Sequence, residues 1–177
     1  SPLLFLLTNT RSMPPDLAED TIRKACQSVK TALKSLGWST EDVFFISRGD
    51  STLRGHAVLE PETINDILGP FDATFHIPAF FEGGRTTVNG VHLLHGLPVH
   101  KSQFAIDKIF GYKTSNLDLW LQEKSNGLIL AESVIRLTIS LLDTAAKSEI
   151  GMRSLVEWLY NLSENKPVIV LSNNDGC

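Results

Sequence analysis

Short apolar runs, each followed at once by a polar loop, constrain the fold of this chain more than any other feature. Residues 49–55 (Gly-Asp-Ser-Thr-Leu-Arg-Gly) follow the run at 43–47, and residues 82–87 (Glu-Gly-Gly-Arg-Thr-Thr) follow the run at 73–78. In an open α/β sheet, ligands bind at the carboxyl ends of the strands. The pattern therefore predicts an α/β fold with a polar, anion-binding site built from these two loops.

Periodicity predicts the remaining elements. An apolar run at residues 3–8 indicates a buried strand, and Pro14 and Pro15 open an amphipathic helix that closes near Gly37. With the run at 43–47 this makes a strand–helix–strand unit, for which parallel pairing with a right-handed crossover is expected. Further strands are expected at 73–78, 134–142 and 168–171. The predicted fold is α/β, a mostly parallel sheet flanked by helices.

A β-hairpin insertion and several helix caps are also expected. The alternating stretch at 88–96 predicts the hairpin. Ser51 or Thr52 is predicted to cap a helix that Pro61 kinks or restarts. Ser115 is predicted to cap a helix around Leu117–Leu121, and another helix is expected over residues 155–162.

The net charge and the cysteine and histidine content limit the kinds of ligand and partner that the chain is expected to bind. The formal net charge of −4 argues against the basic surface that binding to nucleic acid or an anionic membrane requires, so a small-molecule partner is expected. The two cysteines, Cys26 and Cys177, make neither a disulfide framework nor a metal site, which favours a cytoplasmic protein. The histidines show no zinc-ligand spacing, and no metal site is predicted. The oligomeric state is left open.

The first loop offers the best anion anchor. The planar guanidinium of Arg54 matches a carboxylate with two parallel hydrogen bonds. Asp50 suits the vicinal hydroxyl groups of a sugar acid, and Ser51 and Thr52 add small hydroxyl donors. The alternative is that Asp50 and Arg54 pair with each other, with Ser51 acting only as a cap.

The second loop offers backbone donors and another arginine. Gly83 and Gly84 allow close approach of the backbone, so that consecutive amides, with the hydroxyl of Thr86, would cradle a carboxylate or phosphate beside Arg85. The alternative is an ordinary turn into the hairpin.

A third loop makes a weaker contribution. Arg11 and Ser12 follow the first apolar run, but the spacing of Ser12 from Pro15 favours a role for Ser12 in helix capping.

Three motifs taken together resemble the four-carbon acid sugar kinase family. They are Thr-Asn-Thr-Arg-Ser at 8–12, Asp-Ser-Thr-Leu-Arg-Gly at 50–55, and Pro-Ala-Phe at 78–80 followed by Gly-Arg-Thr-Thr-Val-Asn-Gly at 84–90. Their order and spacing also match. The resemblance covers most of the chain and is sharpest between residues 50 and 96.

The resemblance implies a two-domain enzyme whose N-terminal α/β domain binds a tetronate or oxo-tetronate and whose C-terminal domain binds ATP and Mg²⁺ and phosphorylates the terminal hydroxyl. Carried over by motif, Asp50, Ser51 and Arg54 with Gly84, Arg85 and Thr86 hold the sugar acid. Arg11 and Ser12 are weaker candidates. No catalytic residue is assigned.

The chain also departs from the family pattern. An early Asp-Asp-x-Thr-Gly-Ala-like loop and the glycine-rich nucleotide-binding half do not occur in the sequence. We therefore expect residues 1–177 to form a single substrate-binding domain, incomplete at its N-terminus and inactive by itself. The alternative is a non-catalytic module that binds small anions or sugar acids. A dinucleotide-dependent oxidoreductase is disfavoured, because no Gly-x-Gly-x-x-Gly fingerprint follows the first run.

Overall fold

The computed structural model describes residues 3–172 of the 177-residue chain, which divides into two compact units. The first unit comprises Ser1–Arg48 and Gly55–Pro70, and the second comprises Gly49–Arg54 and Phe71–Cys177. Each unit has its own buried residues. The single domain expected over residues 1–177 stays a prediction.

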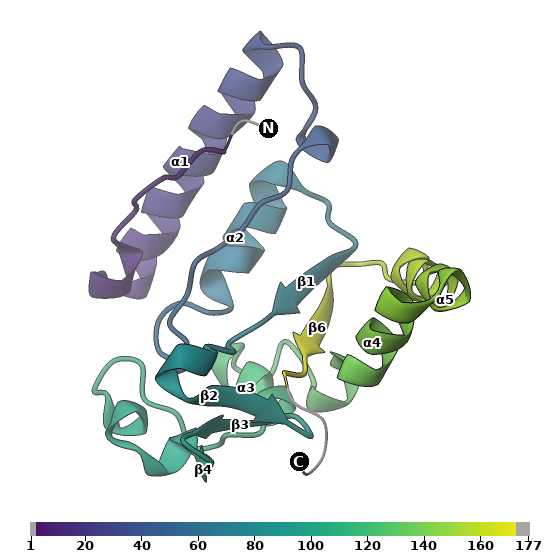
Figure 1. The fold of residues 1–177 in the computed structure, drawn as a ribbon. Helices are drawn as coiled ribbons and strands as arrows, with labels where there is room; N and C mark the ends of the chain where they lie inside the picture. The colour runs from purple at the N-terminus through teal and green to yellow at the C-terminus, as the bar shows by residue number, and fades with distance from the viewer. Residues whose placement is uncertain (1–2, 173–177) are drawn as a thin grey trace. The chain divides into compact units, whose positions relative to one another are not determined.

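The first unit is built on two helices that lie side by side, α1 (Pro15–Ser35) and α2 (Leu59–Leu68) (Figure 1). The predicted start of α1 at the proline pair is confirmed, because Pro15 is its first residue. The backbone N–H that proline lacks would have no hydrogen-bond acceptor within the helix at this first position. The amine of Lys30 donates to the carbonyl of Ile67 at 2.6 Å, which ties α1 to the end of α2. Two short 3-10 turns, Thr10–Ser12 and Thr40–Asp42, complete this unit.

The second unit contains a parallel sheet in the order β1 (Ala73–His76), β6 (Lys166–Val170) and β5 (Ile135–Leu137). Helices α4 (Ile139–Lys147) and α5 (Glu149–Tyr160) lie beside it (Figure 1). Apolar side chains from these elements pack on the sheet: Leu137, Leu141, Leu142, Leu155, Trp158, Leu162 and Val168. The core contacts Ala73 at the start of β1, and from the carboxyl end of this strand the chain continues toward the second loop.

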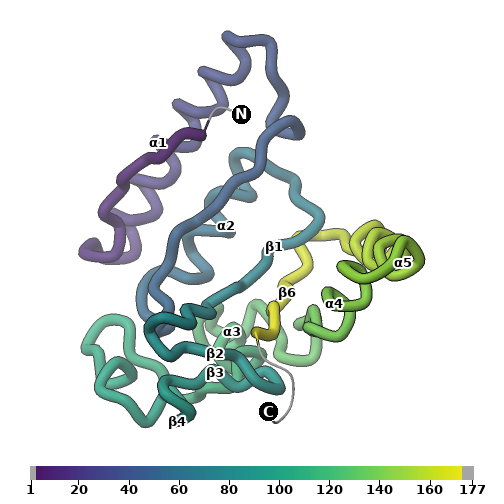
Figure 2. The backbone as a smooth tube through the Cα atoms, in the orientation of Figure 1, coloured from purple at the N-terminus to yellow at the C-terminus, as the bar shows by residue number. Residues whose placement is uncertain are grey.

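An antiparallel sheet follows in the same unit, in the order β2 (Arg85–Val88), β3 (Val91–Leu94) and β4 (Leu97–Pro98). Asn89 and Gly90 both have positive φ, as a two-residue hairpin turn between right-twisted strands requires. The predicted hairpin insertion is thereby confirmed. From β4 the chain runs through the short turns Val99–Lys101 and Gln103–Ile106 to α3 (Leu117–Lys124) (Figure 2).

The predicted fold class is confirmed, but two predicted strands are wrong. Residues 3–8 and 43–47 form no strand, and the parallel pairing expected between them is replaced by pairing among β1, β6 and β5. Leu7 is 96% exposed and Phe44 is 97% exposed. An apolar run becomes a strand only where a neighbouring backbone forms a ladder with it, and local sequence does not supply that neighbour.

Other local predictions also need correction. Only residues 135–137 of the run at 134–142 form a strand, because the hydroxyl of Thr138 accepts from the amide of Leu141 and starts α4 there. The helix predicted at 155–162 begins earlier, as α5. Asn116, and not Ser115, caps α3.

The caps expected in the polar loops are wrong as well. Neither Ser51 nor Thr52 caps a helix: α2 begins at Leu59, and Pro61 lies in its first turn, where proline is tolerated. Ser12 does not cap α1 either, since its hydroxyl donates to the carbonyl of Asn9 at 3.0 Å.

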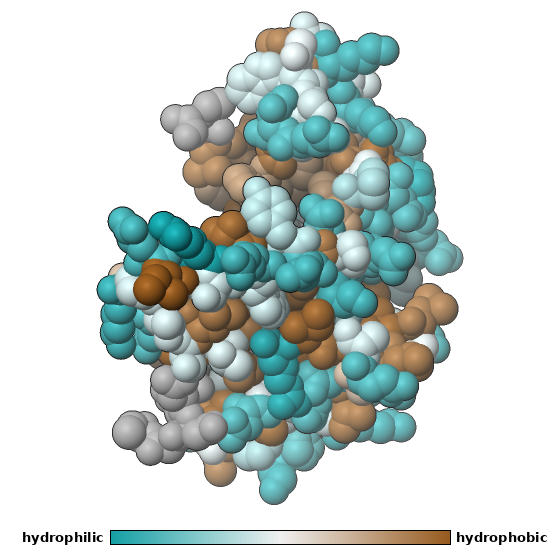
Figure 3. Space-filling model, turned by 90° about the vertical axis from the view of Figure 1, so that its right-hand side faces the viewer, coloured by the Kyte–Doolittle hydropathy of each residue, from teal (hydrophilic) through white to brown (hydrophobic). Residues whose placement is uncertain are grey.

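Apolar patches on the surface alternate with hydrophilic ones on the face drawn in Figure 3. Among the described residues, no helix is long and apolar enough to cross a membrane. Cys26 is a free, buried cysteine, and Cys177 lies outside the described residues.

Candidate functional site

The first loop folds around the carboxylate of Asp50. One carboxylate oxygen, Oδ1, accepts from the amide of Thr52 at 2.8 Å and from its hydroxyl at 2.7 Å. The amide of Leu53 donates to the carbonyl of Asp50 at 3.0 Å, and Leu53 has a φ of 64° although it is not glycine. Its buried side chain, only 2% exposed, holds this conformation in place. The loop is therefore a closed turn with a fixed shape.

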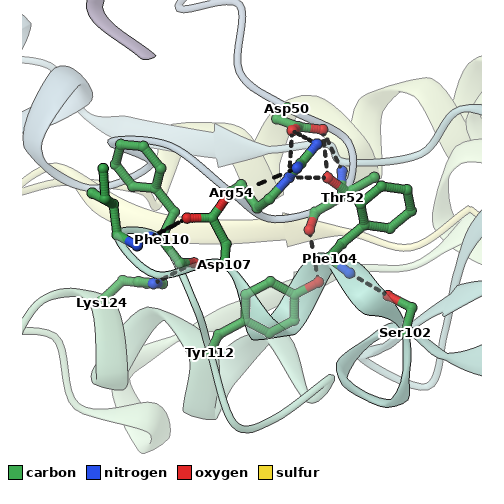
Figure 4. A network of polar contacts seen from close by, with 10 residues as sticks. Asp50, Thr52, Arg54, Ser102, Phe104, Asp107, Phe110, Tyr112 and Lys124 are labelled. Carbon is green, nitrogen blue, oxygen red and sulfur yellow. Dashed lines mark hydrogen bonds and ion pairs between the residues drawn. The ribbon is translucent and has the colours of Figure 1, made fainter. Parts of the chain in front are cut away.

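Arg54 is paired with two carboxylates. Its Nη2 lies 2.9 Å from Asp50 Oδ2 and its Nε 3.1 Å from the same oxygen, while its Nη1 lies 3.9 Å from Asp107 Oδ2 (Figure 4). The pairing of Asp50 with Arg54, left open by the sequence, is thus the arrangement observed. Asp50 shapes the loop and orients Arg54, whose Nη1 is the nitrogen held least closely.

Two buried side chains hold the backbone of this loop. His92 Nε2 donates to the carbonyl of Ser51 at 2.8 Å, and the hydroxyl of Tyr112 donates to the carbonyl of Thr52 at 2.7 Å. A carbonyl only accepts, so the proton of His92 is on Nε2 and its Nδ1 accepts from the hydroxyl of Thr87 at 3.0 Å. Burial lowers the pKa of His92 and raises the pKa of Tyr112 to about 12, so both rings stay neutral.

The chain between Asp107 and Tyr112 is braced in turn by Lys124 of α3. The amine of Lys124 donates to the carbonyls of Phe110 and Gly111 at 3.1 and 2.7 Å (Figure 4). Asp107 Oδ1 accepts from the amides of Ile109 and Phe110, each at 2.9 Å. Burial lowers the pKa of Lys124. This network fixes the position of Asp107 beside Arg54.

Arg85 and Arg54 meet at one aromatic ring. The Cζ of Arg54 lies 4.8 Å from the centroid of Phe104, and the Cζ of Arg85 lies 5.9 Å from the same centroid. The Cζ of Arg85 also lies 5.5 Å from the centroid of Phe80. Within the described residues, Arg85 has no carboxylate partner, and its Nε is buried without a hydrogen bond. We call Asp50, Arg54, Arg85 and Phe104 the two-arginine site.

The glycine loop presents the side chain of Arg85, and the backbone amides of this loop form hydrogen bonds within the turn. The amides of Gly83 and Arg85 both donate to the carbonyl of Phe80, and the amide of Gly84 donates to the carbonyl of Phe81. The predicted cradle of consecutive amides is therefore not formed, because the turn uses these donors itself. A side chain at position 83 would collide with the guanidinium: a Cβ there lies 2.3 Å from Arg85 Nη1.

The remaining candidate residues are placed differently. Successive side chains of a strand point to opposite faces, so Thr86 lies on the face of β2 opposite Arg85. Ser51 contributes its carbonyl to the interaction with His92. Arg11 and Ser12 belong to the other compact unit.

Sequence reasoning missed the supporting residues. Phe104, Asp107 and Tyr112 lie in a stretch without periodicity, and no signal in the sequence marks them. The fully buried His92 lies on β3, and nothing in the sequence distinguishes it from the other histidines. Phe80 had a signal, since it belongs to the Pro-Ala-Phe motif.

The described residues form no cluster of metal-ligating side chains. Residues 3–172 contain no group of three or more His, Cys, Asp or Glu side chains that could hold a metal ion. The glycine loop lacks free amides for phosphate, as described above.

Fold and site together define an α/β protein that bears a cluster of charged side chains on its loops. The chain belongs to the family of sugar-binding N-terminal domains, whose model matches residues 2–173. This confirms the resemblance to the N-terminal domain of four-carbon acid sugar kinases.

A known kinase is similar in sequence to this chain. A D-erythronate kinase of Heliobacterium modesticaldum is 27% identical over 158 residues, which cover 87% of this chain and 34% of the relative. The chain thus spans about a third of that relative's length.

Solved structures share the fold. A Bordetella bronchiseptica protein, crystallised with citrate as a domain-swapped dimer, is 21% identical over 94% of this chain and 35% of its own, with a TM-score of 0.63. A Haemophilus influenzae protein is 19% identical over 92% of this chain and 36% of its own, with a TM-score of 0.65. At these identities the likeness shows the fold alone.

Proposed function

We propose that this chain is the substrate-binding part of a cytoplasmic, ATP-dependent kinase that phosphorylates the terminal hydroxyl of a four-carbon sugar acid. The family of sugar-binding domains and the D-erythronate kinase relative support a sugar acid as the ligand class. ATP and Mg²⁺ are then bound outside the described residues.

The observation that carries the proposal is the meeting of Arg54 and Arg85 at Phe104. Among residues 3–172, Arg85 has no carboxylate partner and its buried Nε has no hydrogen bond, and a carboxylate bound to it would supply both. Arg54 Nη1 offers a second donor from the other loop. Asp107 lies next to this donor and can accept from a sugar hydroxyl.

Calorimetry on the complete natural protein tests the binding role. The titrants are the two four-carbon sugar acids D-erythronate and L-threonate and, for comparison, the hydroxy acid citrate. Arg85→Ala should weaken binding of the preferred tetronate by roughly tenfold to a hundredfold, because it removes a charged hydrogen-bonding partner. Arg54→Ala should weaken it less, because Asp50 already neutralises part of that charge.

Arg153→Ala is the matched control. Arg153 lies on α5 with its side chain 78% exposed, so its loss removes one positive charge without touching the two-arginine site. Equal affinities of the Arg85→Ala and Arg153→Ala proteins would overturn the binding role. Tetronate binding without phosphate transfer from ATP would instead favour the non-catalytic binding module.

A further inference from the structure

We infer that Phe104 is a positioning residue for substrate binding: its ring holds the guanidinium groups of Arg54 and Arg85 so that both face one carboxylated ligand. This inference rests on the proposed function and extends it to a residue of the loop between β4 and α3. Phe104 lies in the 3-10 turn Gln103–Ile106, remote in sequence from both arginines.

The positively charged guanidinium groups of Arg54 and Arg85 both lie near the ring of Phe104. The Cζ atoms lie 4.8 Å (Arg54) and 5.9 Å (Arg85) from the Phe104 centroid, both within the distance at which a cation is attracted by the face of an aromatic ring. Two guanidinium groups repel each other, and Asp50 and Asp107 offset only part of this repulsion because both carboxylates lie on the side of Arg54. The negative face of the ring offsets part of this repulsion while no ligand is bound.

An arginine whose partner is an aromatic ring can still bind a carboxylate. A carboxylate partner would consume the in-plane N–H donors of a guanidinium and neutralise its charge, whereas a ring contacts the face of the group. Arg85 contacts two rings, Phe80 and Phe104, and no carboxylate of the described residues. Its donors are thereby kept for a ligand with the planar geometry of a carboxylate.

The position of Phe104 is itself fixed by polar contacts. The amide of Phe104 donates to the hydroxyl of Ser102 at 3.3 Å, which starts the turn (Figure 4). The amide of Tyr112 donates to the carbonyl of Ala105 at 3.2 Å, and the hydroxyl of the same tyrosine holds the first loop. One residue thus ties the turn that bears Phe104 to the loop that bears Arg54.

The test compares substitutions at position 104 in the complete natural protein, by calorimetry with the preferred tetronate. Phe104→Leu keeps an apolar side chain but removes the aromatic face, and should weaken binding by roughly three- to thirtyfold. Phe104→Tyr keeps the ring and should retain wild-type affinity. Phe44→Leu is the control, because Phe44 is an exposed phenylalanine of the other compact unit.

A double-mutant cycle separates positioning from general stability. If Phe104 acts through Arg85, adding Phe104→Leu to Arg85→Ala should cost clearly less affinity than Phe104→Leu alone. Independent, additive effects would overturn the inference, as would unchanged affinity of the Phe104→Leu protein.

A readout without ligand keeps this inference distinct from the proposed function. The Nε–Hε NMR signals of Arg54 and Arg85 should lose a ring-current shift in Phe104→Leu and keep it in Phe104→Tyr. Unmoved signals contradict the positioning role whether or not the protein binds a tetronate. Absence of tetronate binding by the wild-type protein, with the shifts observed, contradicts the proposed function alone.

Discussion

The phenol hydroxyl of Tyr112 donates a 2.7 Å hydrogen bond to the backbone carbonyl of Thr52, sixty residues earlier in the chain. Both residues are buried. This bond fixes one side of the turn that presents Arg54, and His92 fixes the adjacent carbonyl, that of Ser51. The charged loop is therefore held by two buried side chains, those of Tyr112 and His92.

Removing that hydroxyl should destabilise the protein. Tyr112→Phe leaves the buried carbonyl of Thr52 without its donor, which costs about 1–3 kcal/mol of the free energy of unfolding. Urea denaturation at pH 7 measures the change. Tyr160→Phe, at a position 86% exposed, is the matched control. Equal unfolding midpoints for the two variants would show that the bond contributes nothing.

Acid should destabilise the protein through His76. Burial lowers the pKa of His76 to about 4, so the folded state keeps this ring neutral while the unfolded state binds a proton below about pH 6.5. Stability is therefore lost as the pH falls from about 6.5 toward 4, by on the order of 2–3 kcal/mol from this residue.

The variant His76→Gln should flatten that part of the pH profile. The check is a series of urea denaturation curves between pH 7 and 4.5, with His95→Gln as the control for loss of an imidazole at an exposed position. A His76→Gln profile as steep as that of the wild-type protein would contradict the assignment.

A methyl group at position 83 should displace Arg85. The Cβ of Gly83→Ala would lie 2.3 Å from Arg85 Nη1 and 2.6 Å from a ring carbon of Phe80, so the guanidinium must move. Tetronate affinity should fall nearly as far as in Arg85→Ala. Calorimetry on Gly49→Ala supplies the control, because a Cβ there meets nothing within 4 Å. Full affinity in Gly83→Ala would show that Arg85 is not needed in its present position.

Elements whose signals are local were predictable. Pro15 begins α1 because the preset backbone of proline suits the first helical position, and Asn89 and Gly90 form the hairpin turn because both tolerate positive φ. The runs at 3–8 and 43–47 failed as strands, because strand formation depends on a neighbour that local sequence does not specify.

For the site, the sequence by itself determined which residue types stand in the loops: Asp50 four residues before Arg54, and Arg85 directly after two glycines. Only the tertiary structure decided their roles. It paired Asp50 with Arg54, used the glycine-loop amides within the turn, and brought Phe104 to both arginines. The physical reason is that the surrounding groups decide whether a charged side chain pairs within the protein or stays available to a ligand. Folding brings those groups together from distant positions in the sequence.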